Sequence, residues 1–290
     1  MSLRAAVVIA SAGRPELLAE LAENLAVQTY PITAKVASVP DEKSLPEARM
    51  DGWEILIGVR GASAQRNAGI DALNGAADVV FVFDDDSVVR HDYIAQAIHH
   101  FEQNPGVLAL TGRVVLDGAT GGEIPQEVAK LALAASEDEP LTGRSRPSRT
   151  LYGCNFAFRL AAVPDMRFDE RLPLYSWLED HDFARRLMRR GELAKVDDCV
   201  IVHRGAGSGG RTNHVRLGYS QVMNPIYLHR KGSFPLWLMM LETVPRTMKN
   251  VVRAVFGSEK EWRRARVRGN LLALGDALIG RITPERITEL

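Results

Sequence analysis

The sequence predicts an α/β fold, with a mostly parallel sheet flanked by helices and a helical C-terminal extension. Over the first two hundred residues, short apolar runs alternate with helical patterns, which is typical of strands joined by covering helices. Val79–Phe83 is a continuous apolar run of β-forming residues, as expected of a strand buried on both faces. Residues 213–290 have a helical pattern, interrupted at Pro225, Pro235 and Gly257. We therefore expect one domain over residues 1–212 and a helical extension over residues 213–290.

The first part of the chain contains three expected strands and two expected helices. Ala5–Ala10 is an apolar strand, and Pro15 then opens a helix at a position where its missing N–H costs nothing. Lys35–Val39 and Glu54–Val59 are the next strands. The second helix is expected over Ser63–Leu73, because serine is a suitable N-cap and a glycine follows the end.

The second part of the domain repeats this alternation. After the Val79–Phe83 strand, we expect helices at Tyr93–Phe101 and Trp177–Arg190, and strands at Val107–Leu110, Arg113–Leu116, Tyr152–Arg159 and Val196–His203. The later helix has acids near its start and arginines near its end, which both complement the helix dipole. A polar loop is expected over Glu137–Arg149, and the glycine-rich segment Gly205–Gly210 ends the domain.

Composition favours a cytoplasmic protein. The two cysteines, Cys154 and Cys199, show neither metal-ligand spacing nor a disulfide framework, which favours a reducing compartment. We expect no signal peptide, because the first apolar run is short and no small-residue cleavage pattern follows it. The longest later apolar run, Phe234–Leu241, falls well short of the ~20 residues that a membrane-spanning helix needs.

The zero net charge hides an asymmetry between the two parts of the chain. Of 36 basic and 36 acidic residues, 14 and 6 lie in residues 211–290, so this part has a net charge of +8 and residues 1–210 have −8. The two parts are therefore expected to meet different partners. Aromatic residues among the C-terminal cations suit peripheral contact with an anionic membrane, here the inner face of the cell membrane. A helical cap on the main domain and a dimer contact are the alternatives, and no nucleic-acid partner is expected.

Three adjacent acids, Asp84, Asp85 and Asp86, follow the buried Val79–Phe83 strand. In open α/β sheets, ligands bind outside the carboxyl ends of the strands. Because side chains alternate along an extended segment, Asp84 and Asp86 should share one face while Asp85 points away. Two carboxylates on one side suit a divalent cation that bridges to phosphate oxygens. The alternative is a solvated acidic turn, but a turn needs only one acid.

A second acidic motif, Glu179 to Asp182, begins the expected Trp177–Arg190 helix. Acids at a helix start are common because of the helix dipole. A sugar-transfer site, however, needs a metal for the leaving diphosphate and also a separate carboxylate that deprotonates the acceptor. The two acidic motifs together meet both needs.

With these motifs in place, the chain resembles the family-2 glycosyltransferases, which have the GT-A fold. The matching segments occur in the order of that family over roughly residues 5–210: Val7–Ile9, Gly13–Leu17, Gly61, Gln65–Gly69, Asp84–Asp86, Gly153–Arg159, Glu179–Phe183 and His203. The resemblance implies a hexosyltransferase that uses a nucleotide-diphosphate sugar of the UDP or GDP type, with Mn²⁺ or Mg²⁺ as cofactor. The acceptor that it implies is a saccharide or a lipid-linked saccharide, as in bacterial surface-polysaccharide assembly.

The resemblance also implies a role for each matching residue. The nucleotide-sugar site would consist of Ser11, Gly13, Arg14, Asp41, Arg66, Asn67, Asp84, Asp85 and Asn155. In this set Asn67 supports Arg66, Asp84 contacts the nucleoside, and Asn155 lies near the donor sugar or the acceptor. Asp86 would ligate the metal, and His203 would contact the metal or the diphosphate, unless it is an ordinary strand-ending histidine. Asp180 would be the catalytic base of an inverting transfer, with Glu179 beside it.

Departures from the family pattern narrow the prediction. The second strand ends near Asp41 without the usual paired acids that read the base, so the role of this residue rests on position alone. The Gln-x-x-Arg-Trp signature of processive members is absent, which indicates transfer of a single sugar. A sugar-1-phosphate nucleotidyltransferase would need a glycine-rich loop where this chain has Ser11–Arg14. A non-catalytic nucleotide-binding domain, the other alternative, leaves Glu179 and Asp180 unexplained.

Overall fold

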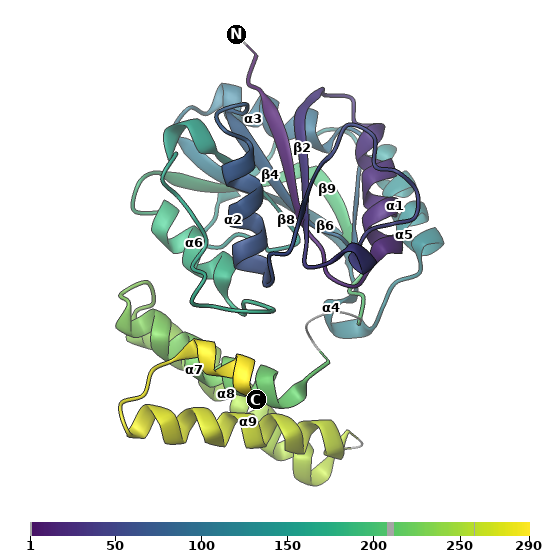
Figure 1. Ribbon diagram of the computed structural model, residues 1–290. Helices are drawn as coiled ribbons and strands as arrows, with labels where there is room; N and C mark the ends of the chain where they lie inside the picture. Colours follow the sequence, from purple (N-terminus) through teal and green to yellow (C-terminus); the bar gives the residue numbers. More distant parts are fainter. Residues whose placement is uncertain (1, 208–211, 258) are drawn as a thin grey trace.

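The structure is a computed structural model that describes residues 2–207, 212–257 and 259–290 (Figure 1). Within these residues, nine strands form one sheet in the order β3-β2-β1-β4-β8-β6-β9-β5, and β7 pairs with β9. The strands are β1 (Ala5–Ala10), β2 (Ile32–Val39), β3 (Glu54–Ile57), β4 (Val79–Asp84), β5 (Ser87–Val89), β6 (Val107–Asp117), β7 (Ser145–Pro147), β8 (Asn155–Arg159) and β9 (Glu192–His203). All but β5, β7 and β8 run in one direction, so the mostly parallel sheet is confirmed.

Helices cover both faces of this sheet (Figure 1). They are α1 (Pro15–Ala26), α2 (Ala62–Ala72), α3 (Tyr93–Gln103), α4 (Gly118–Gly121), α5 (Gln126–Glu137) and α6 (Glu179–Leu187), with short 3₁₀ turns η1 (Glu42–Ser44) and η2 (Leu160–Ala162). Side chains alternate along β1, so that Val7 and Ile9 share one core with α1 and α3, whereas Val8 joins the opposite core with α2 and α6. This two-sided burial explains the unbroken apolar runs of the central strands.

The C-terminal residues form a separate helical layer, as predicted, beside the loops that precede α6 (Figure 1). Its elements are α7 (His214–Arg230), α8 (Leu236–Phe256), α9 (Lys260–Leu278) and the 3₁₀ turn η3 (Pro284–Glu289). Gly218 of α7 and Gly269 of α9 allow a close crossing, because a Cβ at either would clash with the backbone of the other helix. Leu172 and Leu178 of the sheet domain pack against Tyr227 and Leu228 of α7, which attaches this layer to the domain.

Four local expectations need correction. Ser63 is not the N-cap of α2, because Gly61 takes that position with a φ of 101° and the Ser63 N–H donates to Ser176 Oγ at 3.1 Å. Pro225 does not interrupt the helical pattern but lies inside α7. The middle of α7 is buried, so packing offsets the cost of a proline in a helix. The two strands expected within residues 107–116 are one strand, β6, and β7 lies inside the expected loop. Of the glycine-rich segment, residues 208–210 lie outside the described residues.

The structure bears on the expectations about the two cysteines and about membrane-spanning helices. Cys154 and Cys199 are both buried and form no disulfide. Among the described residues, no helix has the length and apolar character that crossing a membrane would require.

Candidate active site

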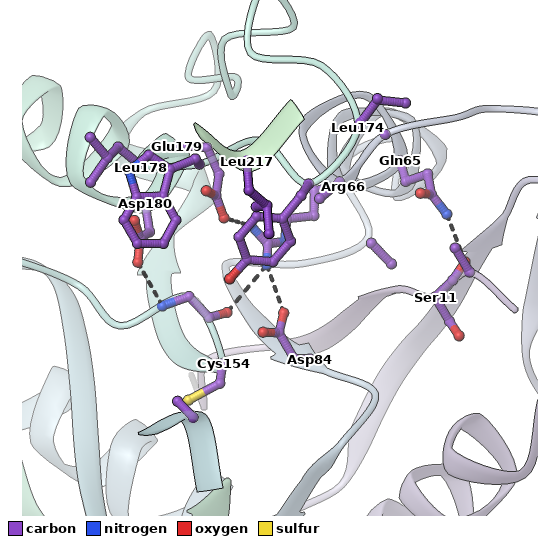
Figure 2. A pocket seen from close by; sticks show the side chains of 18 of the residues that line it. Ser11, Gln65, Arg66, Asp84, Cys154, Leu174, Leu178, Glu179, Asp180 and Leu217 are labelled. Carbon is purple, nitrogen blue, oxygen red and sulfur yellow. Dashed lines mark hydrogen bonds and ion pairs between the residues drawn. The ribbon is translucent and has the colours of Figure 1, made fainter. Parts of the chain in front are cut away.

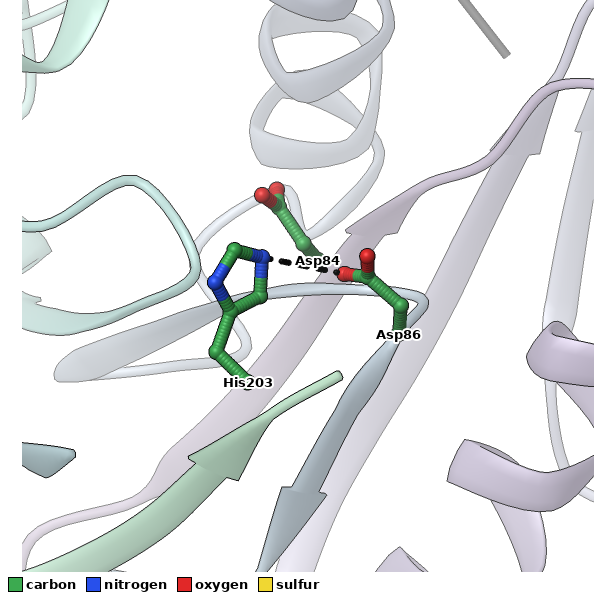
Figure 3. Close-up of side chains that lie close together, drawn as sticks. All are labelled: Asp84, Asp86 and His203. Carbon is green, nitrogen blue, oxygen red and sulfur yellow. Dashed lines mark ion pairs between the residues drawn. The ribbon is translucent and has the colours of Figure 1, made fainter. Parts of the chain in front are cut away.

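A cluster of two carboxylates and one imidazole lies where β4 and β9 end (Figure 3). Asp84, Asp86 and His203 each offer one ligand atom, and these atoms lie within 4.8 Å of one another. Asp85 does not belong to this group, but strand alternation is not the reason, because only Asp84 is in a strand and Asp85 and Asp86 form the turn between β4 and β5. The strands bring the cluster together because β9 pairs with β5, which begins directly after Asp86.

His203 is held in a defined orientation by a carboxylate that sequence analysis missed. Its Nδ1 lies 2.8 Å from Asp117 Oδ1, which leaves Nε2 facing Asp86 Oδ1 at 3.5 Å. Tyr152 donates its hydroxyl to the other oxygen of Asp117 at 2.8 Å. Burial lowers the pKa of His203, but the two carboxylates outweigh it and raise the pKa to about 10. A carboxylate behind a histidine is the usual arrangement at metal sites, where it orients the ring.

The charge of Asp86 is stabilised in turn by its neighbours. It accepts the Ala206 N–H at 2.8 Å and lies 3.6 Å from the Arg14 guanidinium. Burial opposes ionisation, yet His203, Arg14 and this N–H together lower the pKa of Asp86 to about 2. The carboxylate is therefore ionised at neutral pH, which is the state that a cation requires.

Asp85 points into the loop that follows β1. It accepts the Ser11 hydroxyl at 2.6 Å and pairs with Arg14 at 2.7 Å. Burial is the largest influence and raises the pKa of Asp85 to about 7, against the charge of Arg14. Asp85 thus fixes Ser11 and Arg14, both of which line the pocket described below, while its own side chain is buried.

Ser44 connects Gly13 to Asp41 through two hydrogen bonds. Gly13 has a φ of 65°, which favours glycine, and its N–H donates to Ser44 Oγ at 3.0 Å. Ser44 donates in turn to Asp41 Oδ1 at 2.8 Å, and Arg60 lies 3.5 Å from the other oxygen of Asp41. Neither Gly13 nor Asp41 lines the pocket, although Arg60 and Pro40 do. Asp41 is therefore at the rim.

Arg66 links the two acidic motifs (Figure 2). Its guanidinium lies 2.6 Å from Glu179 Oε1 and 2.8 Å from Asp84 Oδ1, and only 3% of its side chain is exposed. Burial and the negative charge of Asp180 raise the pKa of Glu179 to about 8, against the charge of Arg66. Burial acts to lower the pKa of Arg66, but Glu179 and Asp84 raise it overall. This buried ion-pair chain fixes the start of α6 relative to the end of β4.

Asp180 differs from Glu179 in being accessible. One of its oxygens accepts the Gly153 N–H at 2.9 Å and the other accepts the His181 N–H at 2.7 Å. Both acids line the pocket, but Glu179 is buried against Arg66. Of the two acids, only Asp180 is therefore partly exposed where it lines the pocket.

The two asparagines lie in the interior. The Asn67 side chain bonds both the N–H and the carbonyl of Phe168, at 2.7 and 3.0 Å, so it supports the loop before α6. Asn155 is fully buried, where its Oδ1 accepts the Gly112 N–H at 2.6 Å and the Tyr93 hydroxyl at 2.9 Å. The structure places neither asparagine on the pocket wall. Asn155 is the first residue of β8, between β4 and β6, and its side chain turns into the core.

A pocket of about 600 Å³ joins these groups and extends to the C-terminal helices. Figure 2 shows Asp84, Glu179 and Asp180 around it, with Leu217 of α7 at the same pocket. The helical layer contributes Leu217, Gln221, Arg246 and Arg266 to its wall. Sequence analysis missed all four. They had no local signal, because only the docking of the helices brings them to the pocket.

The acidic cluster thus lies at the end of a central strand in a GT-A type α/β fold, and Asp180 lines the same pocket as Asp84 and His203. The chain belongs to the family described as "Glycosyltransferase like family 2", whose model matches residues 4–197.

Three similar proteins agree with this assignment. Over 169 residues the chain is 27% identical to the glucosyl-dolichyl phosphate glucuronosyltransferase of Haloferax volcanii. That match covers 55% of this chain and 53% of the relative, so the chain spans about half the length of that protein. The fold is similar to that of the mannosyltransferase PcManGT from Pyrobaculum calidifontis, solved with GDP-Man and Mn²⁺ (TM-score 0.55, 14% identity, 95% of this chain and 88% of that chain). It is also similar to S. aureus TarS in complex with UDP (TM-score 0.52, 13% identity, 96% of this chain and 92% of that chain). At these identities, the two structures establish the fold alone.

Proposed function

We propose that this protein is an inverting, metal-dependent glycosyltransferase that transfers one sugar from a nucleotide-diphosphate sugar to a saccharide or lipid-linked saccharide. One observation is the main support. Asp84 and His203 of the metal cluster and the Asp180 carboxylate line one pocket, with Asp86 buried beside Asp84 and His203, and an inverting transfer needs both a charge-neutralising group and a base at such a pocket.

The cluster fits Mn²⁺ or Mg²⁺. Carboxylate oxygens are the ligands these cations prefer, and an imidazole suits transition metals such as Mn²⁺ better than Mg²⁺. Asp86 Oδ1 is buried and has no hydrogen bond among the described residues beyond its long 3.5 Å contact with His203 Nε2, so a cation could bind between these two atoms. Asp86 and His203 would hold the ion, with Asp84 beside them and Asp117 orienting the imidazole. When bound, the cation neutralises the charge that develops on the leaving diphosphate.

The remaining residues of the cluster bind and orient the donor. Ser11 and Arg14 face the pocket beside Asp85, so we assign them to the nucleotide, with Gly13 and Asp41 shaping the rim. Arg66 would act through Asp84, which it holds in place, and Asn67 supports the loop in front of α6. Asn155 would contribute only indirectly, by stabilising the position of β8 in the core.

Asp180 is the proposed base. The acceptor hydroxyl oxygen forms a bond to the anomeric carbon as the bond from that carbon to the diphosphate oxygen breaks, and the hydroxyl proton passes to Asp180. Its backbone hydrogen bonds hold the carboxylate in place, and its position in the first turn of α6 favours negative charge. Attack on the face opposite the leaving group inverts the anomeric configuration.

The exposed face of α8 is proposed to rest on an anionic membrane at the cytoplasmic side. Trp237, Leu241, Val244, Met248 and Val252 recur at helical spacing and are between 39% and 61% exposed. Lys249 and Arg253 are exposed on the same helix, whereas its one acid, Glu242, is buried. A second copy would present the same cations and repel, so anionic lipid is the partner that complements this face.

A thermal-shift panel tests the donor class. UDP, GDP, UTP and GTP are compared with and without Mn²⁺, and a diphosphate at about 100 times its dissociation constant should add about 2.7 kcal/mol to the free energy of unfolding. We expect a diphosphate to stabilise the protein more with Mn²⁺ than without it. Preference for a triphosphate would favour a nucleotidyltransferase, and no response to any nucleotide would contradict the proposal.

A further inference from the structure

A glutamine of the helical layer lines the pocket with an NH₂ group that no described residue accepts. Gln221 of α7 is 8% exposed and lies one turn after Leu217, which Figure 2 shows at the pocket. Its Oε1 accepts a hydrogen bond from Asn250 Nδ2 at 2.8 Å, whereas its NH₂ group donates to none of the described residues. Because a largely buried donor costs free energy when it is unpaired, this NH₂ group calls for an acceptor atom in the pocket.

The orientation of the Gln221 amide follows from the buried residues behind it. Arg263 of α9 can only donate, and its Nη1 donates to Asn250 Oδ1 at 2.9 Å. This contact fixes the oxygen of Asn250 toward Arg263 and leaves the Asn250 NH₂ group for Gln221. The side chain of Asn250 is then fully used, because its second N–H donates to Asn270 Oδ1 at 3.1 Å.

The other end of this chain of amides requires the same orientation. Asn270 Nδ2 donates to the backbone carbonyl of Gly218 at 2.7 Å, and a carbonyl can only accept. Asn270 must therefore turn its oxygen toward the NH₂ group of Asn250. Reversing any one of these amides would place two donors or two acceptors against each other. The Gln221 oxygen is thus fixed against Asn250, and its NH₂ group is presented to the pocket.

Gln221 lies on the side of the pocket where the proposed base lies. Three residues further along α7, Asn224 Nδ2 donates to the Trp177 carbonyl at 2.8 Å. Trp177 is three residues before Asp180, and both line the pocket together with Gln221. The groups assigned to the nucleotide come instead from the loop after β1. This part of α7 therefore borders the region in which the acceptor hydroxyl meets Asp180.

We propose that the Gln221 NH₂ group donates a hydrogen bond to a hydroxyl oxygen of the acceptor saccharide and so determines which saccharide is accepted. The inference rests on the proposed function, because it takes Asp180 as the mark of the acceptor side. A neutral amide suits a sugar hydroxyl, which accepts a hydrogen bond without carrying charge. A site built to bond one hydroxyl discriminates against an analogue that lacks it, because the amide is then left unpaired.

A cycle of one substitution and one missing hydroxyl tests this contact on the full chain, saturated with Mn²⁺ and the nucleoside diphosphate that stabilises it best. Octyl β-glycosides of glucose, galactose and mannose are titrated calorimetrically below their micelle concentrations, and the tightest is compared with its monodeoxy analogues. Wild type should prefer the parent over one analogue at least about fivefold, as loss of one hydrogen bond would give. In Gln221→Met, which has a similar size but cannot donate, this preference should fall to within about twofold.

Two controls accompany the cycle. Gln103→Met makes the same substitution at an exposed residue at the end of α3, away from the pocket, and should keep the preference of wild type. The octyl tail is common to parent and analogue, so any contact that it makes with α8 cancels in the comparison.

Nuclear magnetic resonance of ¹⁵N-labelled wild type gives a second readout that does not depend on the folding of a variant. The side-chain NH₂ signal of Gln221 is assigned through its own side-chain carbons. One of its protons should move downfield when the parent glycoside binds, because a proton is deshielded when its N–H donates a hydrogen bond. The monodeoxy analogue identified in the cycle should produce a smaller shift.

Three outcomes would overturn the inference. One is a preference for the parent glycoside that survives in Gln221→Met, and another is a Gln221 signal that does not respond to the glycoside. The third is weaker binding of UDP-GlcNAc or GDP-Man by Gln221→Met with unchanged glycoside binding, which would assign the amide to the donor sugar. Nucleoside diphosphate binding is measured in every variant. If it persists while no glycoside binds wild type, the acceptor inference alone fails; if no nucleotide binds, the proposed function fails.

Discussion

The sheet domain and the helical layer differ in where their polar clusters and their exposed apolar side chains lie. In the sheet domain, the strands bury apolar residues and the charged groups gather at strand ends, in chains such as Asp84, Arg66 and Glu179. In the helical layer, Asn250 is buried among Gln221, Asn270 and Arg263. Large apolar side chains such as Phe256, 84% exposed, lie outside.

This difference bears on the proposed membrane contact of α8. The buried polar cluster around Asn250 fixes how the helices pack against one another, because each buried amide needs a specific partner. An apolar exterior costs free energy in water and is favourable against lipid. The exposed apolar side chains of the helical layer are therefore what the proposed membrane contact rests on.

The largest expected effect is on chemistry in the sheet domain. Asp180→Asn keeps the shape of the side chain and removes its basicity, so turnover should fall by about 10²- to 10⁴-fold. Release of nucleoside diphosphate from the donor measures turnover without a known acceptor, and donor affinity should be nearly unchanged. Near-normal turnover, or a product that retains the anomeric configuration of the donor, would exclude this mechanism.

The next effect concerns the outer face of α8. The double variant Met248→Glu/Val252→Glu should lower binding to phosphatidylglycerol-containing vesicles at least about tenfold, because two apolar side chains no longer enter the bilayer. Leu131→Glu is the matched control, since Leu131 is 70% exposed on α5 of the sheet domain. If the double variant instead dissociates a dimer and vesicle binding is unchanged, this face is a protein interface.

The smallest effect concerns the joint between the two regions. Asp169 accepts hydrogen bonds from Lys231 Nζ at 2.6 Å and from the Tyr227 hydroxyl at 2.8 Å, both at the end of α7. Burial raises the pKa of Asp169, but Lys231 and Tyr227 outweigh it, so the folded-state pKa lies below the usual value. Asp169→Asn should lower the free energy of unfolding by about 1–2 kcal/mol at pH 7.

The pH dependence of this effect follows from the sign of the shift. A lowered pKa gives stability that is complete above the unfolded-state pKa of about 3.9 and is lost as the pH falls through the folded-state value. The difference between wild type and variant should therefore shrink in urea unfolding at pH 3. Asp165→Asn, at an exposed ion pair with Arg190, should change stability less. A constant difference between pH 7 and pH 3 would show that the carboxylate charge is not the cause.

Sequence patterns predicted the sheet domain well where the signals were local. β1 has the predicted bounds, whereas the grouping of Asp84 with Asp86 comes from the turn between β4 and β5 and not from the predicted strand alternation. Asp117 could not be found in this way. It reaches His203 because β6 and β9 run parallel and end together, which is a contact between residues 86 positions apart.

The helical layer was predictable as helices but not as part of the site. Its charge and aromatic content indicated a membrane surface, yet its contribution of Arg246 and Arg266 depends on docking against the sheet domain. The prediction of a helix break at Pro225 was wrong. The local cost of a proline in a helix is about 3 kcal/mol, and it is offset because α7 is buried between its neighbours, which the local sequence does not show. Asn155 lies in the core because β8 runs between two other strands, which no local pattern shows.

The central claim is that the cluster at the ends of β4 and β9 holds the metal for donor binding. Electron paramagnetic resonance of free Mn²⁺ during titration, with the preferred nucleoside diphosphate present, measures this directly. Wild type and Asp138→Ala, an exposed acid elsewhere, should bind one Mn²⁺, whereas Asp86→Ala should leave the ion free and lose the Mn²⁺-dependent part of nucleotide affinity. Equal binding of Mn²⁺ and nucleotide by Asp86→Ala and wild type would contradict the account.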